Sequence, residues 1–252
     1  MMHSGRYLTV IILISLGFSA LSQDNSINEF TSLRYDKSIS AGFEAHSNGY
    51  GINFQYFIHR TVNKNLLFSF DILSLKHPKE TKVVNPIEDA ALPYVYGKIN
   101  SAIPLHFGFG NQFIIADKEV PNGIRIGFSY LIGPNFTLLK PQYLWIYYYR
   151  PDLGKYRVLE KYDPENPVHA NQNNIFGGSS FFHGLSEMGS TFGAFAKTAF
   201  NFEWNKEDVS FKVLETGIMI DFYPQTLPVF AFIDNGKLFV NVYAQISLGK
   251  RW

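Results

Sequence analysis

Apolar and polar residues alternate along eight segments of the chain, with turn residues between most of them. In the clearest segment, 238–249, every second residue from Leu238 is apolar, and the residues between are polar or small except Phe239. A period of two predicts a β-strand with one apolar and one polar face. The eight predicted strands are 38–46, 51–59, 66–75, 105–115, 124–133, 192–204, 211–222 and 238–249.

Three features favour a membrane barrel over a soluble sandwich or a lipocalin-like barrel, which would share the alternation. The segments have about ten residues, the span of a tilted membrane strand, whereas ordinary strands have about five or six. Their polar faces carry mostly Gly, Ser, Asn and Gln rather than Lys and Glu. Aromatic residues lie at segment ends, as interfacial girdles require, namely Tyr50, Phe57, Tyr94, Tyr96, Tyr130, Tyr143, Trp204, Tyr223 and Trp252. The predicted fold is all-β, an eight-stranded antiparallel transmembrane β-barrel.

The connections between the predicted strands alternate between short and long. Those near 61–65, 116–123 and 205–208 are short, those at about 76–102 and 140–190 are long, and 223–237 is intermediate. Outer-membrane barrels have short periplasmic turns and longer extracellular loops, so the long connections are predicted to be extracellular. The short Ser47-Asn48-Gly49 turn is the exception on the outer side. An even number of strands places both termini in the periplasm.

The N-terminus has the composition of an export signal. Arg6 precedes an uncharged apolar run at 8–21, which is too short for a transmembrane helix. Ala20-Leu21-Ser22 offers small residues at a cleavage site, so 1–22 is predicted to be a signal peptide and 23–252 the mature barrel. The alternative is an uncleaved anchor helix. The predicted location is the bacterial outer membrane.

Composition excludes several classes of protein. The chain is 17% aromatic and 46% hydrophobic, which excludes intrinsic disorder. It has no cysteine, which excludes disulfides, thiolate metal sites and a cysteine nucleophile. The net charge of +1 gives no basic footprint for nucleic acid. No motif points to a cofactor or a metal; four loop acids, Asp152, Glu160, Asp163 and Glu165, lack calcium-loop spacing.

Ionisable residues also occur on the polar faces of the predicted strands. They are Glu44, His46, Asp71, Arg125, Lys197, Glu203, Glu215, Asp221 and Arg251. Such residues suit a channel lining or an acid–base site, but an eight-stranded barrel leaves an interior that side chains fill. Because buried charges must pair, the sequence predicts a polar plug in a closed lumen.

The last residues, LFVNVYAQISLGKRW, resemble the C-terminal sorting strand of bacterial outer-membrane barrels. Trp252 is terminal and aromatic, and Leu248 and Ile246 continue the apolar alternation behind it, whereas Lys250 departs from the pattern. The resemblance implies that the barrel-assembly machinery inserts this chain.

The chain also resembles the small outer-membrane β-barrel proteins of Bacteroidota. The segments that carry the resemblance are QDN, HSNGYGINFQY, LKHPKE, YVYGKIN, EKYDP and LGKRW. This group includes accessory barrels of the assembly machinery and of the type IX secretion system. The resemblance therefore implies a location in outer-membrane lipid and lipopolysaccharide, with other outer-membrane proteins as partners.

The longest loop contains an aromatic–arginine cluster. Its members are Trp145, Tyr147, Tyr149, Arg150, Tyr156 and Arg157. Such residues dominate interface hot spots, so they are predicted to bind a partner. The alternative is that 147–149 extends a barrel strand into its aromatic girdle. The Pro-bounded segment 76–97 is a second candidate surface.

These patterns predict a non-catalytic subunit of an outer-membrane complex, with no catalytic residue assigned. One alternative is an enzyme that modifies lipid A with a Ser–His–acid set, drawing on His46, Glu44 and a nearby serine, or on His106, His169 and His183. A small pore is a further alternative.

Overall fold

The computed structural model describes residues 35–77, 79–118, 123–152, 154–204, 209–232 and 235–252. The predicted signal peptide 1–22 and its cleavage site lie outside the described residues. Among the residues that are described, no helix is long and apolar enough to cross a membrane.

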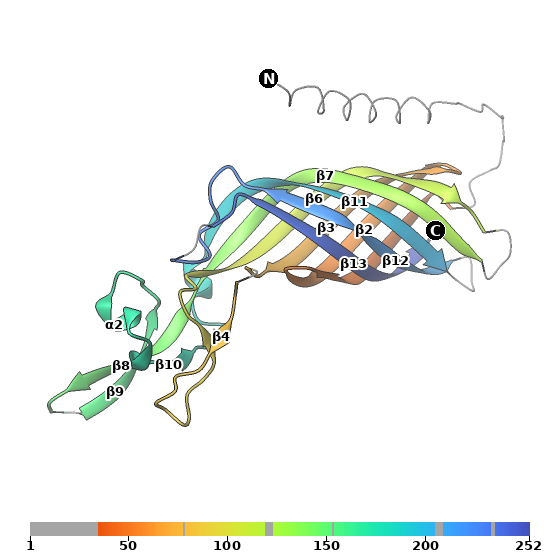
Figure 1. Cartoon of the computed structure of the whole chain (residues 1–252). Helices are drawn as coiled ribbons and strands as arrows, with labels where there is room; N and C mark the ends of the chain where they lie inside the picture. Colours follow the sequence, from red (N-terminus) through yellow and green to blue (C-terminus); the bar gives the residue numbers. More distant parts are fainter. Residues whose placement is uncertain (1–34, 78, 119–122, 153, 205–208, 233–234) are drawn as a thin grey trace, which may run out of the picture. The chain divides into compact units, whose positions relative to one another are not determined.

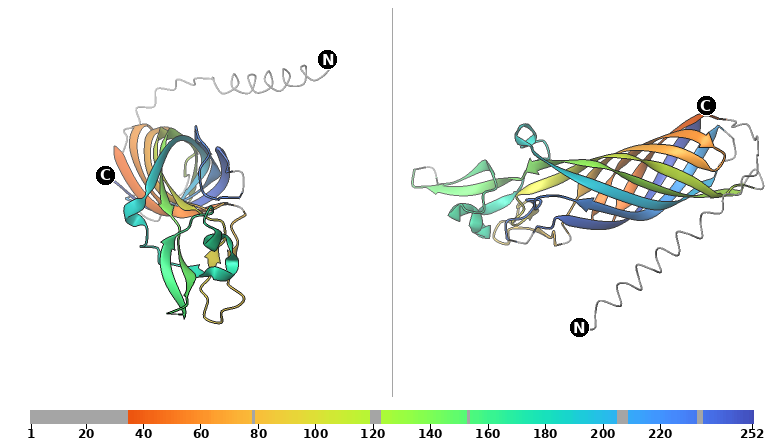
Figure 2. Two further views of the ribbon diagram at one scale, coloured as in Figure 1. Left: turned by 90° about the vertical axis from the view of Figure 1, so that its left-hand side faces the viewer. Right: turned by 90° about the horizontal axis from the view of Figure 1, so that it is seen from above.

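Eight antiparallel strands form a closed barrel, as the alternation predicts (Figures 1 and 2). In chain order they are β1 (Lys37–His46), β2 (Gly49–Thr61), β3 (Lys64–Leu75), β6 (Asn100–Ala116), β7 (Ile124–Pro141), β11 (Gly189–Trp204), β12 (Ser210–Phe222) and β13 (Leu238–Arg251). Each strand pairs with its neighbour in this order, and β1 pairs with β13 to close the ring. Closure leaves no edge strand in the barrel wall.

The predicted strand positions are confirmed, but every barrel strand is longer than predicted, and β6 and β7 exceed the prediction the most. β6, β7 and β11 have 17, 18 and 16 residues. β6 begins at Asn100 rather than 105, and β7 continues to Pro141 rather than 133. The extra residues pair with one another, as Asn100 does with Pro141, so backbone hydrogen bonding extends these strands beyond the apolar alternation.

The connections divide the barrel into two ends. The β1–β2 turn and the connections 76–99, 142–188 and 223–237 lie at one end, hereafter the long-loop end. The β2–β3 turn, the first residues of β1 and Trp252 lie at the other, hereafter the short-turn end; Lys37 and Trp252 exchange backbone hydrogen bonds there. This arrangement agrees with the predicted alternation of short and long connections.

The long connections carry small elements of their own. β4 (Lys82–Val83) and β5 (Tyr94–Val95) form a two-stranded ladder. β8 (Tyr143–Arg150), β9 (Gly154–Lys161) and β10 (Ile175–Gly178) form a three-stranded sheet in the order β10-β8-β9, hereafter the loop sheet. Between β9 and β11 lie α2 (Pro167–Ala170), η1 (Gln172–Asn174) and η2 (Leu185–Glu187). The 147–149 segment therefore belongs to a separate sheet and does not extend a barrel strand.

The outer surface of the barrel wall is apolar. Ile132 is 59% exposed, Phe200 51% and Val242 62%, and each lies in the middle part of its strand. The sorting-signal residues Ile246, Leu248 and Trp252 are also exposed, at 61%, 63% and 53%. Aqueous surfaces carry many more charges than this wall does.

Three of the aromatic residues predicted for the girdles are buried instead. Phe57 points into the lumen because its neighbours Tyr56 and Ile58 occupy the outward positions of β2. Tyr94 packs in the core of the loops, and Tyr223 turns into the barrel mouth after β12 ends. Tyr50, Tyr130, Trp204 and Trp252 are exposed, as girdle residues must be.

The lumen is not uniformly polar, in contrast to the prediction. One apolar cluster contains Phe57, Leu67, Leu131 and Phe195, and another contains Leu73, Ala199, Met219 and Tyr243. At the long-loop end, loop side chains pack against strand residues in a larger apolar cluster of Leu75, Val95, Ala102, Leu139, Tyr223, Leu227, Val229, Phe230 and Phe239. The loops therefore close this end of the barrel.

Candidate functional site

A buried ion cluster joins three strands at the centre of the lumen. Lys197 on β11 donates a 2.6 Å hydrogen bond from Nζ to Glu44 Oε2 on β1, and its Nζ lies 3.4 Å from Asp71 Oδ2 on β3. All three side chains are 0–1% exposed. Alternation places each of them on the inward face, so the closed ring brings them together.

Polar neighbours contact further carboxylate oxygens of the cluster, although Glu44 Oε1 has no hydrogen-bond partner among the described residues. Asn53 donates to Asp71, and Gln245 Nε2 donates to Asn53 Oδ1 at 2.8 Å. Glu215 accepts from the Tyr243 hydroxyl at 2.5 Å and from Gln55 Nε2 at 3.2 Å. The cluster thus contains three acidic side chains, one lysine and several neutral hydrogen-bond donors. Such a network is expected to make a rigid plug.

A second buried set surrounds His106 on β6. Its Nε2 lies 2.7 Å from Asp221 Oδ1, and its ring stacks on Phe195 with centroids 4.2 Å apart. Asn135 Nδ2 donates to Asp221 Oδ1 at 2.7 Å and to the Tyr223 hydroxyl at 2.8 Å. His106 is therefore a lumen residue of the barrel, and its partners were not identified as a set from the sequence.

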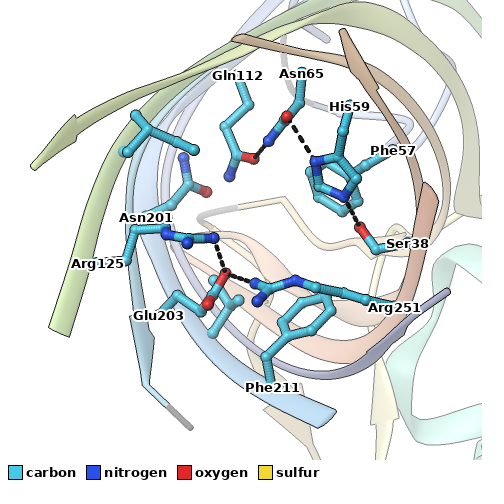
Figure 3. Close-up of a pocket in the computed structure, with 13 residues that line it drawn as sticks. Ser38, Phe57, His59, Asn65, Gln112, Arg125, Asn201, Glu203, Phe211 and Arg251 are labelled. Carbon is cyan, nitrogen blue, oxygen red and sulfur yellow. Dashed lines mark hydrogen bonds and ion pairs between the residues drawn. The ribbon is translucent and has the colours of Figure 1, made fainter. Parts of the chain in front are cut away.

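The predicted lumen residues do not form one network. Arg125 and Glu203 lie at the short-turn end, where Arg251 donates to Glu203 and Arg125 Nη1 lies 3.8 Å from Glu203 Oε2 (Figure 3). Arg125 also donates from Nε to Asp117 Oδ1 at 2.8 Å. His46 is buried near the long-loop end of β1, and no hydrogen bond among the described residues joins it to the central cluster.

A chain of hydrogen bonds lines a cavity at the short-turn end (Figure 3). His59 Nδ1 donates to Asn65 Oδ1 at 2.7 Å, which leaves Nε2 to accept from the Ser38 hydroxyl at 3.1 Å. Asn65 then donates to Gln112 Oε1 at 2.9 Å. The cavity has a volume of about 20 Å³, little more than one water needs. The sequence showed Ser38 and His59 on polar faces, but their proximity depends on strand register.

The six predicted partner-binding residues lie on two faces of the loop sheet. Tyr147 pairs with Arg157 across β8 and β9, and Trp145 and Tyr149 share that face. Their face, which also carries Lys155, is hereafter the open face. Tyr156 and Arg150 lie on the opposite face; Tyr156 stacks on Tyr148, with Arg150 6.0 Å from the Tyr156 ring. Alternation along β8 and β9 thus divides the six residues between two faces, and their role in binding a partner stays a prediction.

Cations cover aromatic rings on the open face. Lys155 Nζ lies 3.8 Å from the Tyr147 ring centroid, and the Arg157 guanidinium lies 4.3 Å from the Phe176 ring centroid. The hydrogen bond from Lys155 holds the pKa of Glu88 below its usual range. Tyr149 is 77% exposed and is the least covered aromatic on this face.

The opposite face packs on the core of the loops. Leu144, Ile146 and Ile175 are fully buried there together with Tyr94 and Tyr162. Burial raises the pKa of the Tyr162 phenol to about 12. This core gives the loop sheet a fixed fold of its own.

His169, a histidine of the long loop, is buried and helps to hold the loop together. His169 is 2% exposed, its Nε2 lies 2.9 Å from Glu160 Oε2, and its Nδ1 accepts from the backbone N–H of Asp163. Within the described ranges, no group of three or more His, Asp or Glu residues could hold a metal ion.

Comparisons with known proteins find solved structures that resemble this chain with low TM-scores. No protein-family model matches the chain, and no curated protein matches it. Among solved structures, Ail, the attachment invasion locus protein of Yersinia pestis, is 10% identical, with a TM-score of 0.42 over 87% of this chain and all of that one. Neisserial surface protein A is 8% identical, with a TM-score of 0.40 over 86% and 95% of the two chains.

A third solved structure is the N-terminal β-barrel domain of Pseudomonas aeruginosa OprF. It is 6% identical, with a TM-score of 0.32 over 86% of this chain and 98% of that one. The assignment of this chain as an eight-stranded antiparallel β-barrel rests on its own closed strand pairing.

Proposed function

We propose that this protein is a non-catalytic outer-membrane β-barrel that serves as an accessory subunit of an outer-membrane complex. The membrane location is supported by the distribution of side chains in the barrel, which is the reverse of that in a water-soluble protein. Apolar residues are exposed on the outside, and paired charges are buried inside. A bilayer requires this distribution, whereas water opposes it. The resemblance of the sequence to small barrels of Bacteroidota, and of its end to a sorting strand, agrees with this location.

The lumen supports an anchor rather than a pore. The central ion cluster fills the middle of the barrel, and the loop cluster around Phe230 and Leu227 fills the long-loop end. Eight strands leave an interior that side chains fill, and here the inward side chains are buried and many of them are hydrogen bonded to one another. The outward wall and the loops are then the surfaces left for function.

The open face of the loop sheet is the proposed docking surface for a protein partner. It combines Trp145, Tyr147 and Tyr149 with Arg157, the residue types that dominate interface energies. The loop core beneath the sheet pre-organises these side chains, which lowers the entropic cost of binding. The partner is a second outer-membrane protein, because the loop sheet follows directly from a barrel strand.

A photo-crosslinking amino acid at Tyr149 is expected to yield a discrete protein adduct in cells that make this protein. The matched control is the same amino acid at Arg150, the next residue, which is also exposed but lies on the opposite face. The adduct from position 149 should weaken when Arg157→Ala removes a cation from the open face. Equal adducts from both positions, or none from position 149 in a folded barrel, would contradict the docking surface.

One observation favours testing the enzymatic alternative. The order of bonds from Ser38 to His59 to Asn65 is that of a nucleophilic triad. However, Ser38 is 2% exposed, and the cavity of about 20 Å³ has no room for an acyl substrate. The arrangement therefore satisfies buried polar groups without offering a reaction site.

We expect a fluorophosphonate probe to leave Ser38 unlabelled in the purified barrel. The physical reason is exclusion of the probe, and intact-mass spectrometry reads the result directly. Ser38→Ala is the matched control, because any background labelling at other serines persists in it. Labelling that both Ser38→Ala and His59→Ala abolish would establish the enzyme alternative instead.

A further inference from the structure

An apolar groove of about 540 Å³ runs along the outside of the barrel wall at the long-loop end. Outward side chains of several strands line it, including Phe43, Tyr50, Ile72 and Ile103, and Phe181 of the loop before β11 borders it. Its volume falls within the range of about 300–1,000 Å³ that is usual for small-molecule sites. In the proposed orientation this groove faces the outer leaflet of the membrane.

The groove lies over an interruption of the strand ladder between β3 and β6. The β3–β6 register pairs Ile72 with Leu105 and Leu75 with Ala102, and no pair is formed between these two in the described strands. Pro104 lies in this interval and has no N–H to donate. The inward residues Leu73 and Ala102 consequently reach the groove between the strands.

Lysines surround the long-loop end of the groove. Lys76 and Lys98 line it, and Lys140 lies opposite the lining residue Ser101, with its Nζ 5.3 Å from the Phe181 ring centroid. Glu80 pairs with Lys98 at 2.8 Å. The three ammonium groups and the Glu80 carboxylate, which pairs with Lys98, give a local charge of about +2 by this count.

Lys140 is the least compensated of the three. It is 4% exposed, and its hydrogen bond is a long one, 3.5 Å to the Pro141 carbonyl. The positive charge of Lys98 repels it. Buried cations are normally paired, so an anion at this position would supply the missing partner.

We propose that this groove binds one molecule of lipid A, with an acyl chain along the apolar wall and a phosphate on Lys76, Lys98 and Lys140. The inference rests on the proposed membrane location. Charge complementarity selects the phosphate, and the apolar side chains that line the groove accept the chain. Lipid A is the phosphorylated lipid of the leaflet that this end of the barrel would face.

The test is native mass spectrometry of the full-length barrel in detergent, titrated with bisphosphorylated lipid A. Enzymatically dephosphorylated lipid A and phosphatidylglycerol serve as competing probes. We expect Lys76→Gln and Lys140→Gln to weaken lipid A binding about fivefold each, the effect of one basic residue near an anionic lipid surface. Ser101→Trp should block the groove without changing its charge.

The matched control is Lys64→Gln, which should leave binding unchanged. Lys64 begins β3 at the short-turn end, and its Nζ lies 5.6 Å from the centroid of the Phe113 ring. It resembles Lys76, which follows the other end of β3 and whose Nζ lies 5.5 Å from the centroid of the Tyr50 ring. Binding of dephosphorylated lipid A or phosphatidylglycerol as tightly as lipid A would overturn the proposal, as would wild-type binding by Lys76→Gln/Lys140→Gln.

Insertion into lipid vesicles separates this result from the membrane proposal. A barrel that inserts and keeps its heat-modifiable mobility on gels, yet does not bind lipid A, refutes the lipid site alone. A barrel that fails to insert refutes the membrane location on which the site rests.

Discussion

Lys197→Met is expected to destabilise the folded barrel by about 3–5 kcal/mol, the cost of removing one partner from a buried ion pair. The substitution preserves the length of the side chain but leaves Glu44 and Asp71 buried without their cation. Denaturant titration of the barrel in lipid vesicles, followed by circular dichroism, measures the change in the free energy of unfolding.

Two further variants make the result specific to the central ion cluster. Lys64→Met removes a lysine that lies over an aromatic ring at the barrel surface and should change the free energy of unfolding by less than about 0.5 kcal/mol. Adding Glu44→Gln to Lys197→Met removes one of the unpaired charges and should recover part of the loss. A Lys197→Met barrel as stable as the wild type would show that the cluster is hydrated and the lumen open.

Ile132→Arg is expected to cost about 2–4 kcal/mol of folding free energy in a bilayer, the value for arginine at the midplane on the lipid face of a barrel. Ile132 lies midway along β7 and is 59% exposed on the wall. The measurement is the free energy of unfolding from vesicles as a function of denaturant concentration.

The matched control for Ile132 lies on the same strand. Ile124 begins β7 at the short-turn end and is 56% exposed, so Ile124→Arg places the same side chain near the interface, where the cost falls to about 0–1 kcal/mol. Equal, small effects at both positions would mean that the wall faces water and that the membrane location is wrong.

The sequence predicted the barrel well because alternate residues of a β-strand point to opposite faces of the sheet. Once a strand such as 238–249 is located, every second side chain is outward, and closure of the ring cannot change this. The same rule holds for the loop strands 143–150 and 154–161. It places Arg150 and Tyr149 on different faces of the loop sheet, and likewise Tyr156 and Arg157. The aromatic–arginine cluster was predicted from residue type alone, without this rule, and its division between two faces was therefore missed.

The contents of the lumen could not be predicted in the same way. Which inward residues meet depends on register and shear across all eight strands, and neither quantity is encoded locally. Glu44 and Lys197 are 153 residues apart, and Ser38 approaches His59 only through the β1–β2 register. The apolar layers around Phe195 and Met219 were missed because single apolar residues on polar faces interrupt the alternation only slightly.

The pairing of β1 with β13 has a consequence for the order of folding. The first barrel strand finds its second neighbour only when the last strand has been made, so the ring cannot close during synthesis. Lys197 on β11 reaches Glu44 on β1 through the lumen, although two strands, β12 and β13, separate them in the barrel wall. We therefore expect the ion cluster to stabilise the closed ring relative to an unclosed sheet. The central ion cluster is therefore expected to form completely only after β13 has paired with β1.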